Sequence, residues 1–226
     1  MKSVLISIRP RWAEKICHKI GNDTNRNPIY EKPIEVRRSK PSEVPFRGLI
    51  YATKPKEWYK CGAVRVSDES LWLASGKVEM CDGLKFWGDC VENYQCLNGK
   101  VIGEFICNTV EEFHEWELSP QGKFADFERE RLAEFLTASC LSEEEVVRYR
   151  ENLPYYQPLY GWHISDLKIY DKPKELSEFY RICKNPCKPS NGKTLCLTTK
   201  LLKMNGCDGK IPLTRPPQSY MFVEEV

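Results

Sequence analysis

Cationic side chains stand beside short apolar runs in the first sixty residues. Arg9 follows the run at residues 4–8, and Lys32, Arg37 and Arg38 flank a second run that begins at Ile34. An arginine can hold phosphate oxygens through two N–H donors at once, and an aromatic ring can stack on a base. This arrangement favours an RNA or nucleotide ligand in a basic cleft. The residues predicted to contact RNA or phosphate are Arg9, Trp12, Arg37, Arg38, Lys54 and Ser165, with Lys32 as a further cation.

A lysine near carboxylates is the second chemical feature. Burial lowers the pKa of a lysine and neighbouring carboxylates raise it, so Lys32 with Glu35 or Glu104 could act as an acid/base pair. The alternative to catalysis is that Lys32 and its carboxylate form a structural ion pair. The alternative to phosphate binding by Arg37 and Arg38 is that they lie on a solvated strand face. Glu35, Glu104, His163 and Ser165 could also read a base. The predicted catalytic residues are Lys32, Glu35, Glu104 and His163.

Adjacent residues of a strand face opposite sides of a sheet. If Trp162 is buried in the core, His163 therefore faces solvent or a ligand, where its imidazole could bind phosphate or move a proton. A hydrogen-bonded structural histidine is the alternative. Trp12 is similarly open between a core position and a stacking platform.

Four cysteines are close together near the C-terminal end of the chain. Cys183, Cys187, Cys196 and Cys207 are compatible with a structural zinc site, although the second pair lacks the usual close spacing. Reduced, buried thiols are the alternative, and no other cofactor is expected. The chain has 11 cysteines and 3 histidines, which argues against a multi-histidine metal centre.

Net charge does not favour a polyanion partner, but its distribution is uneven. Lys and Arg number 34 against 32 Asp and Glu in 226 residues. The charged side chains of residues 1–60 are mostly basic, and those of residues 111–151 are mostly acidic. The acidic segment could instead contact a host protein. The run at residues 4–8 is too short for a signal-peptide core, and no stretch is long enough to span a membrane. We expect a cytoplasmic protein.

Apolar spacing predicts an alternation of strands and helices. A strand at residues 4–8 leads into a helix that starts at Pro10 and ends at Gly21, with Trp12, Ile16 and Ile20 on one face. Residues 100–107 form a strand in which Glu104 shares a face with Ile102 and Ile106. The other predicted strands are 34–37, 48–53, 160–170 (one strand or a pair) and 219–224; the other predicted helices are 123–139, one capped by Ser142 with Glu145, and one that starts near Pro173 and buries Leu176, Phe179 and Tyr180.

Several strands with interleaved helices predict an α+β fold. Six motifs lie at residues 7–16, 31–38, 50–55, 100–105, 162–165 and 213–219. Their order resembles the ASCH domain of the PUA-like superfamily of small RNA-associated β-barrels, and the last two motifs resemble longer phage and bacterial forms. We therefore expect one domain over residues 1–226, a small mixed or antiparallel PUA-like β-barrel with flanking helices and irregular insertions at 57–97 and 183–210.

The resemblance implies a cleft between the first helix and the strand at residues 32–38. Some members of the family resemble ribonucleases that act on single strands, and one bacterial branch hydrolyses an acylated cytidine with a lysine and a threonine. Lys32 matches that lysine, but Glu35 stands at the position of the threonine. The sequence therefore leaves three hypotheses: an RNA or nucleotide binder, a hydrolase of RNA or of an acylated nucleoside, and a phage or prophage protein-interaction module.

Overall fold

The structure is a computed structural model. It describes residues 1–54, 97–114, 130–151, 153–154, 156–183 and 209–225 with their side chains. Elsewhere it describes the backbone of short elements: β6 (Cys61–Ser67), β7 (Ser70–Ser75), β8 (Val78–Glu79), β9 (Lys85–Phe86), β10 (Gln95–Cys96), β16 (Lys193–Leu195), β17 (Leu202–Met204) and the start of α3. The predicted insertions at 57–97 and 183–210 lie mostly outside the described residues.

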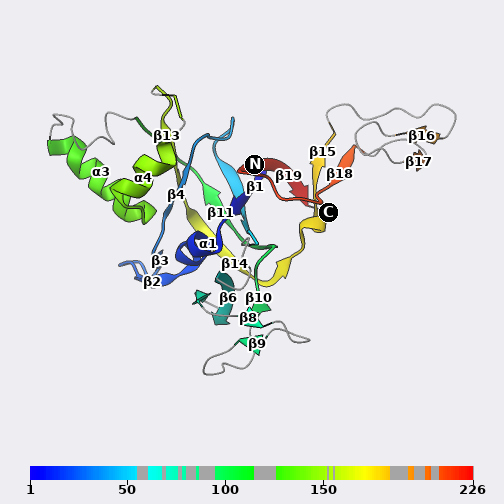
Figure 1. The fold of residues 1–226 in the computed structure, drawn as a ribbon, viewed down its shortest axis with the longest axis horizontal. Coiled ribbons are helices and arrows are strands. Elements are labelled where there is room, and N and C mark those ends of the chain that lie inside the picture. The colour runs from blue at the N-terminus through cyan, green and yellow to red at the C-terminus, as the bar shows by residue number, and fades with distance from the viewer. Residues whose placement is uncertain are drawn as a thin grey trace.

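A seven-stranded mixed sheet is the centre of the fold (Figure 1). Its order is β14 (Ser165–Lys174), β11 (Lys100–Cys107), β5 (Phe46–Ala52), β1 (Lys2–Ile8), β19 (Tyr220–Glu225), β15 (Phe179–Ile182) and β18 (Lys210–Pro212). β1 runs parallel to β5 and antiparallel to β19. The pairing of Ser3 with Val223 brings the two ends of the chain side by side, as Figure 1 shows.

Alternation along β1 gives this sheet two buried faces. Val4, Ile6 and Ile8 face one core cluster, and Leu5 faces another. Helix α1 (Pro10–Cys17) covers the first face with Ala13, Ile16 and Cys17, all buried. Pro10 occupies the first helical position, where its fixed φ angle suits a helix start.

A second sheet, of order β12 (Val110–Phe113), β13 (Leu159–His163) and β4 (Ile34–Arg37), carries the other helices. Ile34 and Val36 pack with Phe135 of α3 (Asp126–Ser139) and Val146 of α4 (Glu143–Arg150). Figure 1 shows both helices beyond β4 and β13, at one end of the molecule. Because strand residues alternate, Glu35 and Arg37 face away from these helices.

Several predicted elements are present where the sequence places them. The strands at 4–8, 34–37, 48–53, 100–107 and 219–224 correspond to β1, β4, β5, β11 and β19, and residues 160–170 form the predicted pair of strands. Ser142 caps α4: its hydroxyl accepts from the Glu145 amide, and the Glu145 side chain accepts from the Ser142 amide. The α+β class is confirmed.

The barrel is not shown. The strands of the described residues form an open seven-stranded sheet, two three-stranded sheets and three two-stranded ribbons. Sequence alternation indicates which face of a strand is buried, but it does not decide whether the ends of a sheet meet.

The first helix is shorter than predicted. It ends at Cys17 because His18 is extended, and Ile20 lies exposed in β2 (Lys19–Asn22), which pairs with β3 (Pro28–Tyr30). The spacing of Ile16 and Ile20 suits a helix, but the hairpin makes backbone hydrogen bonds that continuation of the helix would remove.

Two further predictions about local structure are wrong. Residues 171–180 contain no α-helix: β14 runs to Lys174, and the 3-10 turn η1 (Leu176–Glu178) leads into β15, which buries Phe179 and Tyr180. In β11, an irregularity between Val101 and Gly103 breaks the alternation. Ile102 therefore shares the α1-facing core with Phe105 and Cys107, whereas Val101 packs on the opposite face.

Candidate functional site

Lys32, Glu35 and Arg37 form a buried polar group, which we call the Arg37 cluster. Their exposed fractions are 2%, 6% and 6%. The Glu35 carboxylate lies 3.5 Å from Lys32 Nζ and 2.9 Å from an Arg37 terminal nitrogen. β4 places Glu35 and Arg37 on its α1-facing side, and Lys32 joins them from the segment just before the strand. The predicted Lys32–Glu35 pair therefore exists.

Lys32 is held tightly. Its Nζ donates to the carbonyls of Ile34 (2.7 Å) and Ser139 (2.6 Å) and lies 5.2 Å from the centre of the Trp12 ring. Burial lowers the pKa of Lys32, and the charge of Glu35 opposes that change. The ammonium thus joins the end of α3, β4 and α1, which is a structural role available whether or not it also does chemistry.

Arg37 has a donor left over. One terminal nitrogen donates to the Ser7 carbonyl at 2.9 Å and the same nitrogen pairs with Glu35. Its Nε is buried and has no hydrogen-bond partner in the part of the chain that the structure describes, and the same is true of the Nε of Arg38. A buried donor without an acceptor costs free energy, so most such donors in proteins are paired. Both N–H groups would gain from an acceptor supplied by a ligand.

Aromatic rings and more cations surround the cluster. Arg38 lies 4.9 Å from the centre of the Tyr149 ring, and Arg11 lies 4.6 Å from that of Trp12. Burial raises the pKa of Tyr149, and its electrostatic neighbours include Arg37, Glu35, Arg38 and Arg9. The predicted residues Arg9, Trp12, Arg37 and Arg38 are therefore brought together.

Tyr149 and Ser139 were not singled out by the sequence motifs. Tyr149 is half-buried on α4, and Ser139 is the last residue of α3. Both lie more than a hundred residues after β4, and no spacing rule connects them to it. The acidic segment around α4 offers little further guidance, since Glu145 is already engaged by the helix cap and by Arg11 at 3.4 Å. A host protein as partner stays a prediction.

Glu104 belongs to a different group, the Arg47 cluster of Arg47, Glu104 and Tyr170. Arg47 Nε donates to Glu104 at 2.8 Å, and the Tyr170 hydroxyl donates to the same carboxylate at 2.7 Å. Burial raises the pKa of Glu104, but hydrogen bonds from Tyr170 and Arg47 outweigh it and hold the pKa below its ordinary value. Glu104 faces the side of the sheet opposite α1, so the predicted alternative of a Lys32–Glu104 pair is not formed.

His163, Ser165 and Lys54 lie around the ends of strands. Trp162 is fully buried, as the prediction for His163 requires, and His163 Nε2 lies 3.3 Å from Glu111. The Ser165 hydroxyl donates to the Ile106 carbonyl at 2.9 Å. Lys54 is exposed just after β5, where the Thr53 amide donates to the Ile8 carbonyl next to Arg9. A role of these side chains in binding or catalysis stays a prediction.

The proposed zinc ligands cannot be assembled from the described residues. Cys183 is buried just after the end of β15. Cys187, Cys196 and Cys207 lie outside the described residues, so the zinc hypothesis stays a prediction.

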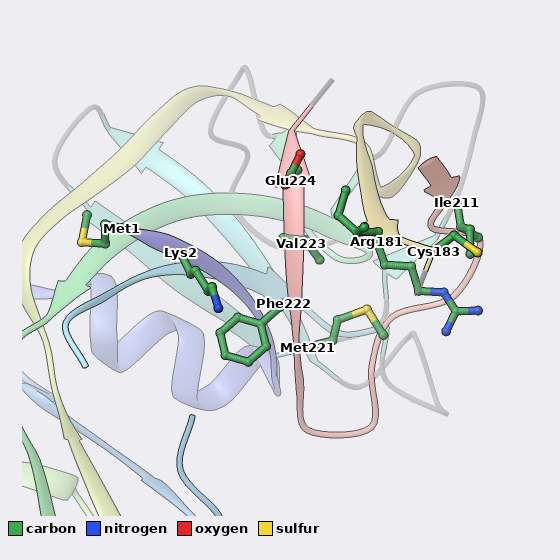
Figure 2. A pocket seen from close by; sticks show the side chains of 10 residues that line it. Met1, Lys2, Arg181, Cys183, Ile211, Met221, Phe222, Val223 and Glu224 are labelled. Carbon is green, nitrogen blue, oxygen red and sulfur yellow. The ribbon is translucent and has the colours of Figure 1, made fainter. Parts of the chain in front are cut away.

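One cavity among the described residues lies elsewhere. It has a volume of about 850 Å³ and is lined by the start of β1, by β19 and by the paired strands β15 and β18 (Figure 2). Lys2, Arg181 and Glu224 are its charged residues, and the rest of its lining is apolar. It shares no residue with the Arg37 cluster, and the predicted basic cleft between α1 and β4 is not shown.

No family model and no curated protein matches this chain. Among solved structures, it is similar to the ASCH protein of Zymomonas mobilis at 16% identity and a TM-score of 0.46, over 99% of this chain and 88% of that one. One mutant form of that protein gives 16% identity and a TM-score of 0.46, over 99% and 89%. Another gives 16% identity and a TM-score of 0.42, over 78% and 77%. These structures carry the name of the ASCH family, which is the family that the sequence motifs resemble.

Among the described residues, no helix has the length and apolar character that a membrane span needs.

Proposed function

We propose that the protein binds RNA or a nucleotide at the Arg37 cluster, with Arg37 as the anchor. The observation that carries the proposal is the buried Arg37 Nε, which has no acceptor among the described residues. The Nε of the next residue, Arg38, is likewise buried without an acceptor among the described residues. Phosphate and nucleobase oxygens are acceptors that suit guanidinium donors.

The charge around Tyr149 supports an anionic ligand. The positive charges of Arg9, Arg37 and Arg38 lower the pKa of the Tyr149 hydroxyl, and the negative charge of Glu35 raises it. Lys32 adds a further cation beside Glu35. Cations in excess over carboxylates attract a polyanion locally even when the whole chain is nearly neutral.

Trp12 supplies a surface for a base. Its indole is half-buried, and the Arg11 guanidinium that lies over it is exposed. An exposed cation on a ring contributes only about 0.5–1 kcal/mol, whereas stacking of a base on an aromatic ring contributes about 1–3 kcal/mol. A base can therefore replace Arg11 on the ring at a net gain.

Fluorescence anisotropy with a labelled single-stranded RNA tests this proposal. The wild type should bind with an affinity that falls as salt rises from about 50 to 200 mM. Arg37→Lys keeps the charge but removes the Nε donor, and it should weaken binding at least about tenfold. The matched control is Arg47→Lys, whose arginine also pairs with a glutamate but whose Nε already has an acceptor, on the other face of the sheet. Equal affinities of wild type and Arg37→Lys would overturn the proposal.

Hydrolysis at Lys32 is the second candidate function. The observation in its favour is the lowered pKa of this buried lysine, 3.5 Å from a carboxylate, because such a lysine can exchange a proton closer to neutral pH. Both carbonyl contacts of Nζ favour the structural role instead.

A denaturing gel of the same RNA samples, with an acylated cytidine tested in parallel, separates the two functions. If the protein is a hydrolase, the wild type should cleave one of these substrates, and Lys32→Met should abolish turnover while RNA affinity falls only slightly. Intact RNA and nucleoside after long incubation would contradict hydrolysis, and binding would be the only function left. Full activity of Lys32→Met would remove Lys32 from the mechanism.

A further inference from the structure

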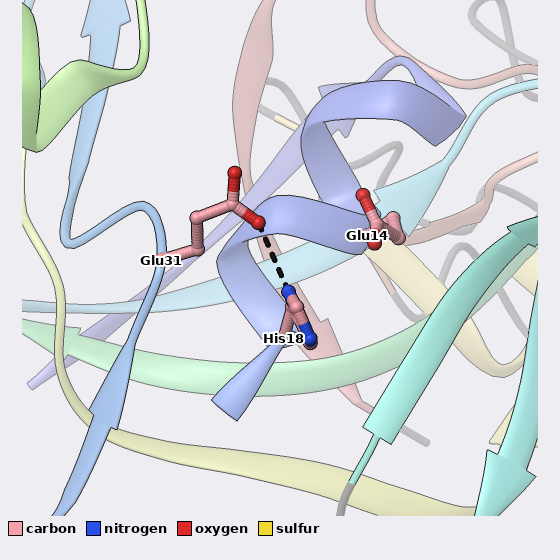
Figure 3. A group of neighbouring side chains, drawn as sticks. All are labelled: Glu14, His18 and Glu31. Carbon is pink, nitrogen blue, oxygen red and sulfur yellow. Dashed lines mark hydrogen bonds and ion pairs between the residues drawn. The ribbon is translucent and has the colours of Figure 1, made fainter. Parts of the chain in front are cut away.

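Glu14, His18 and Glu31 bring two carboxylates and an imidazole together at the end of α1 (Figure 3). One ligand atom from each lies within 4.8 Å of the other two. His18 Nδ1 is 3.0 Å from a Glu31 carboxylate oxygen. Two ligands at neighbouring positions of a metal ion lie about 3 Å apart when the metal–ligand bonds are about 2.1 Å. The three side chains are half-buried, so they leave a path for an ion to enter.

The backbone holds this geometry in place. Glu14 and His18 are four residues apart and so emerge on one side of the helix end. The amide of Glu31 donates to the His18 carbonyl at 2.9 Å, and the amide of Lys32 donates to the Lys15 carbonyl at 3.1 Å. These two bonds tie the segment that carries Glu31 to the last turn of α1. The backbone positions from which the three side chains extend are therefore fixed relative to one another.

Glu14 is only partly compensated. In the described part of the chain it accepts no hydrogen bond and joins no ion pair, although it is half-buried. Burial and the nearby charge of Glu31 raise the pKa of its carboxyl, and the charges of His18 and Lys15 offset this only in part. Lys15 pairs with Glu31 and not with Glu14. A carboxylate facing another carboxylate without its own cation is a position that a bound cation would stabilise.

We propose that Glu14, His18 and Glu31 bind a divalent metal cation of the Mn²⁺ type. Two carboxylates and one imidazole are hard or borderline ligands that suit such ions, and they leave positions for water. Lys15 then competes with the metal, because its ammonium pairs with the Glu31 carboxylate when the metal is absent. The site is separate from the one proposed for RNA, since none of its residues belongs to the Arg37 cluster.

Titration of the full chain with Mn²⁺ alone, followed by the EPR signal of free Mn²⁺, tests this assignment. Mn²⁺ is the probe because it has little affinity for thiols, and the chain has 11 cysteines. The wild type should bind one Mn²⁺, and both Glu14→Gln and His18→Ala should weaken binding at least about tenfold. Lys15→Met should tighten binding, because it removes the competing ammonium. That gain distinguishes a metal site from a structural ion-pair group, in which loss of Lys15 could only do harm.

His163→Ala is the matched control, since His163 also lies beside a glutamate, Glu111, at 3.3 Å. It should leave Mn²⁺ binding unchanged. Glu14 makes no hydrogen bond or ion pair with another described residue, so Glu14→Gln should fold normally, which circular dichroism would check. No Mn²⁺ binding up to millimolar concentration, or binding that Glu14→Gln and His18→Ala leave unchanged, would overturn the proposal.

Discussion

The protein holds two arginine–glutamate clusters that look alike in sequence and differ in their surroundings. In the Arg47 cluster, on the sheet face away from α1, the guanidinium reaches Glu104, Tyr170 and Glu225. In the Arg37 cluster, one terminal nitrogen contacts both Ser7 and Glu35, and Nε is left without an acceptor. Side chains of the Arg47 cluster are about one-quarter exposed, whereas those of the Arg37 cluster are nearly fully buried.

This difference separates stabilisation from function. A satisfied and partly solvated network contributes to stability and asks for no ligand. A buried network with a surplus donor costs free energy in the absence of a ligand, which is typical of functional sites. We therefore assign binding to the Arg37 cluster and structure to the Arg47 cluster, and four predictions test that division.

The largest expected effect is the loss of the countercharge in the Arg37 cluster. Glu35→Gln leaves Lys32 and Arg37 buried without a carboxylate, which should lower the free energy of unfolding by about 3–5 kcal/mol. Glu104→Gln, in the more exposed cluster, should cost about 1–3 kcal/mol. Urea denaturation at neutral pH measures both. Equal losses would remove the distinction between the clusters.

Ring substitutions should affect binding on one side only. Trp12→Leu removes the proposed stacking platform and should reduce RNA affinity by about 1–3 kcal/mol. Tyr170→Phe removes a hydroxyl from the Arg47 cluster and should leave RNA affinity unchanged. Anisotropy titrations at one fixed salt concentration compare the two variants. A comparable loss of RNA affinity with Tyr170→Phe would indicate that the RNA binds on the sheet face away from α1, and it would contradict the proposal.

The clusters should also differ in their dependence on alkaline pH. The pKa of Lys32 is lower in the folded chain than in the unfolded chain, so the unfolded chain binds more protons between these two values. The stability of the wild type relative to Lys32→Met should therefore rise with pH across that window, up to the ordinary lysine value of about 10.4. Denaturation curves for both proteins from neutral pH to that value check this. Parallel pH profiles would contradict it.

The smallest effect is expected for Glu104 at acid pH. Its pKa is lower in the folded chain, so its contribution to stability is present above the ordinary glutamate value and is lost as pH falls through the folded value. Thermal unfolding of wild type and Glu104→Gln between about pH 6 and pH 3 measures this loss, starting from the ordinary value of about 4.3. The variant should show a shallower decline, and an unchanged slope would show that other carboxylates carry the effect.

The sequence predicts local structure correctly where one short segment contains all the residues that interact. Pro10 at the start of α1 and the Ser142–Glu145 capping box are such cases, because the groups involved are at most a few residues apart. The strand at residues 34–37 also follows from its own alternation, which correctly places Ile34 and Val36 on one face. The pairing of Lys32 with Glu35 follows from the same segment.

Predictions that needed distant residues were less successful. The helix expected after Pro173 is replaced by β14 and β15, because pairing with β11 and β19 satisfies the backbone there. Glu104 is predicted as a possible partner of Lys32, but it lies with Arg47 on the face of β11 opposite Phe105 and α1. Its own segment does not show which face of β11 meets Lys32. Tyr149 was missed because its neighbours Arg37 and Arg38 lie far from it in sequence.

The sequence by itself determined the α+β class, most of the strands and the concentration of cations around β4, since these depend on residue type and short-range periodicity. Tertiary structure decided which of those cations are buried, which carboxylate each one meets and which donor remains without an acceptor. The physical reason is that burial and hydrogen-bond partners depend on elements that meet across the fold. Arg37 and Arg47 are the same residue type near a glutamate, and only packing makes one of them a candidate for ligand binding.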